Sequence, residues 1–165
     1  MKYLKLTESI NYLDKLDITP YPRDVMESLK QNNGFIFLDD RLGKFYYLAN
    51  IVEKWLRPFE SVLFLVCEYG IWPSRENVYL TSRVRMSYGD KRSISEAPGC
   101  LFEKQETEDL VLHLHLALLN CWGGCVASEK KVFYFSHDDW AGFSGPYGDK
   151  IADEWRNSIL KLDNS

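Results

Sequence analysis

The stretch that decides the fold is Ser61-Val62-Leu63-Phe64-Leu65-Val66-Cys67, which is apolar at odd and even positions alike. A strand that is covered on both faces has this continuous pattern, whereas a strand with one face in water alternates apolar and polar residues. The sequence therefore predicts a buried strand near the middle of a sheet. Because a membrane span needs about 20 apolar residues, the same run predicts no transmembrane helix.

Shorter apolar runs and helical spacings on both sides of this strand predict that strands and helices are interleaved. The expected strands are Phe35–Leu38, Phe45–Leu48, Gly99–Glu103, Cys125–Ala127 and Val132–Phe135, and the expected helices are Thr7–Leu16, one around Val25–Leu29, a short turn at Ile51–Leu56, Pro73–Gly89, Thr107–Leu119 and Asp149–Leu162. Two hairpins are expected, with loops at Asp39–Lys44 and Ser128–Lys131. This pattern predicts an α/β (mixed α+β) fold, in which a central mixed β-sheet of about five to six strands is flanked by helices. The length of 165 residues predicts a single globular domain, 1–165.

Acidic residues are concentrated in the last third of the chain. Residues 105–165 carry ten Asp and Glu against five Lys and Arg, and the whole chain has a net charge of −4. An acidic surface repels the phosphates of DNA and RNA, so we expect no nucleic-acid partner. The same field attracts a basic protein. A solvated face that only aids solubility is the alternative interpretation of these charges.

The amino-terminal residues predict the cellular compartment of the protein, and the compartment predicts the state of its cysteines. Residues 1–6 mix charged and apolar side chains and show no secretory signal, which predicts a cytoplasmic protein without membrane association. In that compartment the four cysteines are expected to remain reduced structural thiols. The spacing of Cys121 and Cys125 fits neither a redox motif nor half of a zinc site. His113 and His115 lie about 200° apart on a helix, so they cannot face one ion, and we expect no metal or cofactor.

One polar cluster, Ser136-His137-Asp138-Asp139-Trp140, directly follows a predicted strand, at a position where sheet-based domains present functional groups. In an enzyme, His137 would act as a general base, with Asp138 or Asp139 orienting its ring. In a purely structural interpretation, Ser136 or Asp138 forms a turn or caps a helix, and Trp140 folds back on the core. Binding of a partner is the third interpretation of the cluster.

Four phrases carry a resemblance to a known family. They are Glu68-Tyr69-Gly70-Ile71-Trp72-Pro73-Ser74 with Glu76-Asn77, then Ser87-Tyr88-Gly89-Asp90, then Glu96-Ala97-Pro98-Gly99, and last Ser136-His137-Asp138-Asp139-Trp140. Over residues 55–142 the chain resembles a family of small bacterial proteins, some of which look like immunity proteins encoded with polymorphic or contact-dependent toxins. The family carries no activity that can be transferred to individual residues.

The resemblance implies a non-catalytic protein-binding module that neutralises a cognate, basic toxin domain. Aromatic residues make up 15% of the chain, and aromatic anchors ringed by charge dominate many protein interfaces. The expected contact set combines such anchors with acidic residues, namely Glu68, Trp72, Asp138, Asp139, Trp140, Asp153 and Glu154.

Two alternatives stay open from the sequence, and each has its own structural signature. A small hydrolase predicts a concave pocket that contains His137 with a carboxylate within hydrogen-bond reach. A ligand-binding regulatory domain predicts a deep apolar pocket without charged partners.

Overall fold

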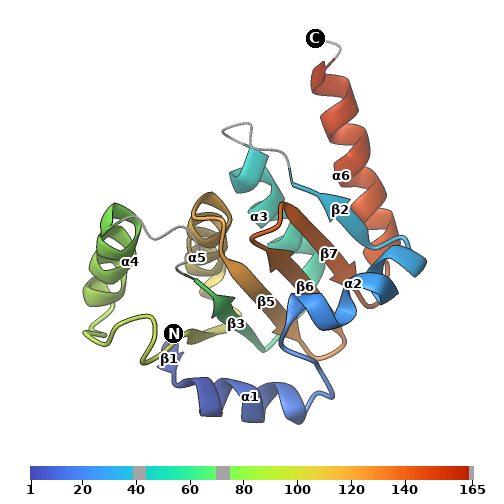
Figure 1. The fold of residues 1–165 in the computed structure, drawn as a ribbon. Helices are drawn as coiled ribbons and strands as arrows, with labels where there is room; N and C mark the ends of the chain where they lie inside the picture. The colour runs from blue at the N-terminus through green and yellow to red at the C-terminus, as the bar shows by residue number, and fades with distance from the viewer. Residues whose placement is uncertain (39–43, 70–74, 164–165) are drawn as a thin grey trace.

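Figure 1 shows the computed structural model of the chain, which describes residues 1–38, 44–69 and 75–163. These residues form six helices and one sheet of seven strands. The strands are β1 (Lys2–Leu4), β2 (Phe35–Phe37), β3 (Ser61–Glu68), β4 (Gly99–Glu103), β5 (Gly123–Ser128), β6 (Lys131–Ser136) and β7 (Trp140–Ser144). The helices are α1 (Leu6–Asp14), α2 (Pro22–Gln31), α3 (Lys44–Leu56), α4 (Arg75–Ser87), α5 (Thr107–Leu119) and α6 (Gly148–Asp163).

The sheet confirms the predicted fold class and corrects its details. Its order is β1-β4-β3-β5-β6-β7-β2, and β3 pairs with β4 on one side and β5 on the other, as expected of an internal strand. Every pair is antiparallel, so the sheet is not mixed. It also has seven strands rather than five or six, because the short strands β1 and β7 add to the predicted ones.

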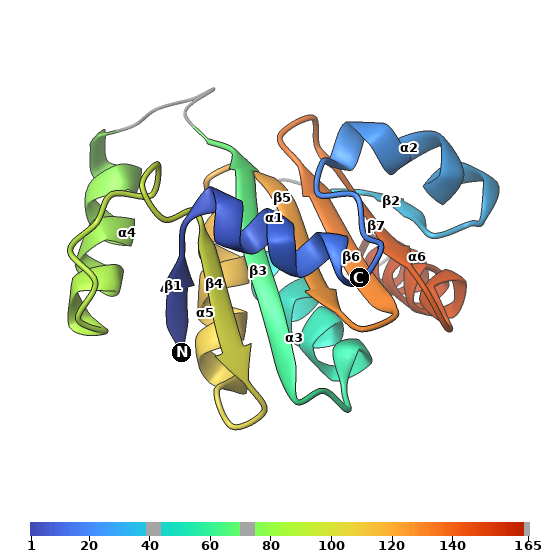
Figure 2. The ribbon, with the colours of Figure 1, turned by 90° about the horizontal axis from the view of Figure 1, so that it is seen from below.

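Helices cover both faces of the sheet, with α1 and α2 on one side and α3, α5 and α6 on the other (Figure 2). The central strand explains how both faces become buried. Val62, Phe64 and Val66 belong to the core under α3, α5 and α6, whereas Leu63 and Leu65 belong to the core under α1 and α2. The alternation of a strand thus places one continuous apolar run in two cores.

The second half of the first predicted hairpin is wrong. Phe45–Leu48 lies in α3, and residues 39–43 of the expected loop lie outside the described residues. Within α3, Phe45, Leu48, Val52 and Leu56 are buried, at the spacing of one helical face. This apolar face packs on the sheet and outweighs the strand preference of the aromatic run.

One predicted helix and one predicted hairpin are confirmed. Helix α5 has the predicted bounds, and β5 and β6 form the predicted hairpin, in which Ser128 pairs with Lys131. The turn residue Glu129 has a positive φ of 30°, as tight hairpin turns require. Among the described residues, none of the helices combines the length and apolar character needed to cross a membrane.

Helix α6 covers the outer edge of the sheet at β2. The Arg156 guanidinium donates hydrogen bonds from Nη2 to the carbonyl oxygens of Asn33 (2.7 Å) and Phe35 (2.9 Å). The Trp155 indole donates to the carbonyl of Phe37 at 3.4 Å. These alternate carbonyls point away from β7, so α6 satisfies the acceptors that an exposed edge strand would otherwise offer to another chain.

Candidate functional site

His137 lies in the turn between β6 and β7, where its ring bridges two carboxylates. Nδ1 is 2.9 Å from Oε2 of Glu68, the last residue of β3, and Nε2 is 3.2 Å from Oδ1 of Asp138. The side chain of His137 is 9% exposed. Asp139, with φ of 58°, takes the left-handed conformation that turns the chain into β7. The sheet thus places Glu68 and Asp138 on either side of the His137 ring.

Arg23 of α2 closes this cluster from the other side. Its Nε is 3.4 Å from Oε1 of Glu68, and its Nη2 is 3.5 Å from Nε2 of His137. A general base needs one ring nitrogen that faces a substrate. Here Nδ1 faces Glu68, and Nε2 faces Asp138 and Arg23. The arrangement therefore ties α2 to the ends of β3 and β6, and each ring nitrogen has a charged neighbour among the described residues.

The nearest thiol does not supply an activated nucleophile. Cys67 precedes Glu68 on β3, and its Sγ lies 3.6 Å from the carbonyl oxygen of Pro20. Burial, with a smaller contribution from the negative charge of Glu68, raises the pKa of the Cys67 thiol to about 12. Burial also raises the pKa of Cys125. Because the thiolate is the reactive form, both groups are inert structural thiols at neutral pH.

The prediction of a partner contact has a different result for each of the two tryptophans in the expected set. Trp140 is only 4% exposed and stacks on Phe35, with 5.5 Å between ring centroids. The expectation that Trp140 anchors a partner is therefore corrected, because the first residue of β7 points into the core under α1 and α2. Trp72 lies outside the described residues.

The acidic residues of the set remain at the surface. Asp138 and Asp139 are exposed in the β6–β7 turn. Asp153 is exposed on α6 and forms an ion pair with Arg156. Glu154, also exposed, lines a hollow between α6 and α3. The predicted acids therefore lie in two places. Glu68 of β3, whose side chain is 18% exposed, lies with Asp138 and Asp139 at the His137 turn, and Asp153 and Glu154 lie in the first half of α6.

An exposed aromatic feature, which the sequence reasoning missed, lies beside Glu154. Tyr46 and Tyr47 of α3, named here the tyrosine ridge, are 55% and 47% exposed. Tyr46 contacts the ring of His115 edge-on at 5.5 Å, and Tyr47 stacks on Trp155 at 6.3 Å. A hollow of about 450 Å³ toward α6 and another of about 520 Å³ toward α5 flank the ridge. The sequence signal was present but was interpreted as a strand.

A buried polar network connects β1 with α5. Nδ1 of His113 lies 2.7 Å from the carbonyl oxygen of Asp109, which can only accept, so Nδ1 carries the proton. Nε2 then accepts a hydrogen bond from the Tyr3 hydroxyl at 2.8 Å. Burial lowers the pKa of His113, and the positive charge of Arg85 lowers it further. This histidine is therefore a neutral core residue.

Within the described ranges, no three His, Cys, Asp or Glu side chains are grouped so that they could hold a metal ion. Comparison with protein-family models, with curated proteins and with solved structures gave no match.

Proposed function

We propose that the protein is a non-catalytic binding module of the immunity type, which acts in the cytoplasm and occludes a basic toxin domain. The observation that carries this proposal is the tyrosine ridge. Large, rigid, amphipathic side chains at the surface are typical hot spots of protein interfaces. Tyr46 and Tyr47 are held by neighbouring rings, so little side-chain freedom is lost when a partner packs against them.

Charge around the ridge supports a basic partner. Glu154 lines the hollow on the α6 side, and Glu108 of α5 lines the hollow on the other side. Lys54 lines both hollows, and Glu53 and Arg57, which form an ion pair, line the hollow on the α5 side. The three acidic and two basic residues that line the two hollows leave a net charge of −1. The surplus of acidic residues in the last third of the chain adds a longer-range attraction. Complementary charge mainly accelerates association, whereas the aromatic anchors slow dissociation.

The hydrolase alternative retains one favourable observation, the 2.9 Å contact between His137 and Glu68. A histidine oriented by a carboxylate is half of a general-base arrangement. The other ring nitrogen, however, faces Asp138 rather than an open position. Turnover of an ester or amide substrate that His137→Gln abolishes would decide for the hydrolase and against the binding module.

The proposal requires a toxin gene beside this gene, and the direct test uses the toxin domain which that gene would encode. Purified toxin domain and purified chain are mixed, and both the affinity and the inhibition of toxin activity are measured. We expect Tyr46→Ala and Tyr47→Ala together to weaken binding by about 30-fold or more, as for two hot-spot residues. Tyr79→Ala is the matched control, because Tyr79 is 66% exposed on α4, away from the ridge.

Three results would contradict the proposal. The first is wild-type protein that neither binds nor inhibits the neighbouring toxin. The second is an equal loss of affinity in the Tyr79→Ala control, which would remove the ridge from the interface. The third is an association rate that does not fall when salt is raised, since a basic partner steered by acidic residues must associate more slowly in high salt.

A further inference from the structure

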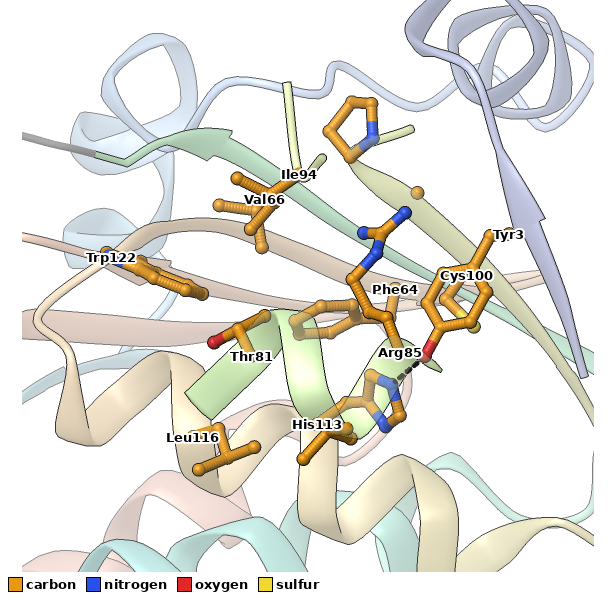
Figure 3. A pocket seen from close by; sticks show the side chains of 13 residues that line it. Tyr3, Phe64, Val66, Thr81, Arg85, Ile94, Cys100, His113, Leu116 and Trp122 are labelled. Carbon is orange, nitrogen blue, oxygen red and sulfur yellow. Dashed lines mark hydrogen bonds between the residues drawn. The ribbon is translucent and has the colours of Figure 1, made fainter. Parts of the chain in front are cut away.

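A small cavity lies between α4, the β1–β4 edge of the sheet and α5 (Figure 3). The volume of the cavity itself is about 20 Å³, which is enough for one or two water molecules. The volume is about 380 Å³ when the space that is open to solvent is included. The walls are mostly apolar, and Figure 3 shows Phe64, Val66, Ile94, Leu116 and Trp122 around it.

One charged side chain enters this apolar space. Arg85 of α4 is 4% exposed, and Figure 3 shows its guanidinium inside the ring of lining side chains. Nη1 donates a hydrogen bond to the carbonyl oxygen of Ala97 at 2.8 Å, and the guanidinium carbon lies 4.3 Å from the centre of the Tyr3 ring. Nε and Nη2 are buried and have no hydrogen-bond acceptor among the described residues. Nε and Nη2 together form the edge with which arginine binds a carboxylate through two parallel hydrogen bonds.

A second unsatisfied group lines the same cavity. Thr81 lies one helical turn before Arg85 on α4, and its buried hydroxyl also has no partner among the described residues. Buried polar groups in native proteins are nearly always hydrogen-bonded, and an unpaired one destabilises the fold by about 1–3 kcal/mol. Three donors without acceptors, grouped on one cavity, therefore indicate a bound acceptor.

The local charge favours an anion over a neutral acceptor. The Asp90 carboxylate receives hydrogen bonds from Nε of Arg92 at 3.1 Å to both oxygens, and it also receives one from Nη2. Its distance to Nη2 of Arg85 is 3.7 Å, beyond a hydrogen bond. One carboxylate thus serves two guanidinium groups, and one buried positive charge remains without a hydrogen-bonded counter-charge.

We propose that the cavity beneath α4 binds a carboxylate of the size of formate, with its oxygens accepting hydrogen bonds from Nε and Nη2 of Arg85, and with the Thr81 hydroxyl as a further donor on the cavity wall. Chloride is a single spherical acceptor, so it cannot take up the two parallel hydrogen bonds that Nε and Nη2 offer to a carboxylate. This site is separate from the tyrosine ridge and stands independently of the proposed toxin partner.

The test titrates the intact protein with sodium formate. Sodium chloride at equal ionic strength is the reference, and sodium butyrate serves as a carboxylate that is too large for the cavity. A ligand of so few atoms is expected to bind with a Kd of about 1–10 mM. At about ten times that concentration, the melting temperature rises by about 3–6 °C relative to chloride. Arg85→Met abolishes the shift, and Thr81→Val reduces it. Arg83→Met is the matched control, because Arg83 is an exposed arginine on the same helix and its loss changes the charge equally.

A measurement on the wild type keeps the test valid where Arg85→Met does not fold. Intermolecular nuclear Overhauser effects are recorded between the C–H proton of formate and the side chains that line the cavity. Their presence supports the site. No shift with formate, a shift of the same size in chloride or in butyrate, or nuclear Overhauser effects only to residues outside the cavity would each overturn the proposal and leave water as the acceptor for Arg85.

Discussion

Acidification should destabilise the protein through His113. Its Nδ1 donates to the Asp109 carbonyl and its Nε2 accepts from Tyr3, so the folded protein holds the neutral ring. A protonated ring would lie buried near the positive Arg85, which is why the pKa in the folded state lies below the ordinary value of 6.5. The unfolded chain therefore binds more protons as the pH falls below 6.5, and folded stability decreases in that direction.

The size of the effect follows from proton linkage. If the folded ring stays neutral while the unfolded ring titrates at its ordinary pKa, moving from about pH 7.5 to about pH 5.5 removes about 1.4 kcal/mol of the free energy of unfolding. The loss ends once the pH falls below the pKa of the folded state. The pKa of Asp90 is held down by hydrogen bonds from Arg92, so its stabilising contribution is lost only at more acidic pH.

Urea unfolding followed by tryptophan fluorescence at the two pH values measures this loss. His113→Gln should be less stable at neutral pH, by about 1–3 kcal/mol, because the buried hydrogen bonds are disturbed. Its stability should nevertheless depend less on pH, by about 1.4 kcal/mol. His115→Gln is the comparison, since the pKa of the less buried His115 is also lowered by burial. A His113→Gln protein with the full pH dependence of the wild type would refute the reasoning.

Three further substitutions test the fold. Arg156→Ala should increase self-association in sedimentation experiments, because it frees two edge carbonyls of β2, whereas Asp153→Ala should not. Gly124→Ala should destabilise by about 1–3 kcal/mol or more in urea unfolding, since a Cβ there would lie 2.0 Å from the carbonyl oxygen of Leu65 across the β3–β5 pair. Trp140→Ala should destabilise by about 3–5 kcal/mol in the same assay, and a mild effect would show that this ring is not in the core.

Much of the sheet could be predicted because its signals are local. The continuous apolar run of β3 and the β5–β6 hairpin are written in consecutive residues. Strands β1 and β7 could not be predicted in this way. Lys2–Leu4 is ordered by pairing with β4, and Trp140–Ser144 lies between β6 and β2, so both depend on partners distant in sequence.

The residues of the candidate site could be predicted from the sequence, whereas the contacts between them could not. The sequence placed Glu68 and His137 at strand ends, yet their contact depends on how β3, β5 and β6 are aligned. It suggested Asp138 or Asp139 as the carboxylate that orients the ring, whereas Glu68 contacts Nδ1. The burial of Arg85 could not be predicted, because an arginine in a polar helix is normally exposed.

The contact between α6 and β2 matters during synthesis, because α6 is made after the strand that it covers. Every strand of the sheet precedes α6 in the sequence, so a growing chain can assemble the sheet before Arg156 has left the ribosome. During that interval the carbonyls of Asn33 and Phe35 remain available to neighbouring nascent chains. A message that stops before α6 should therefore yield a product that aggregates or is degraded, rather than a slightly smaller folded protein.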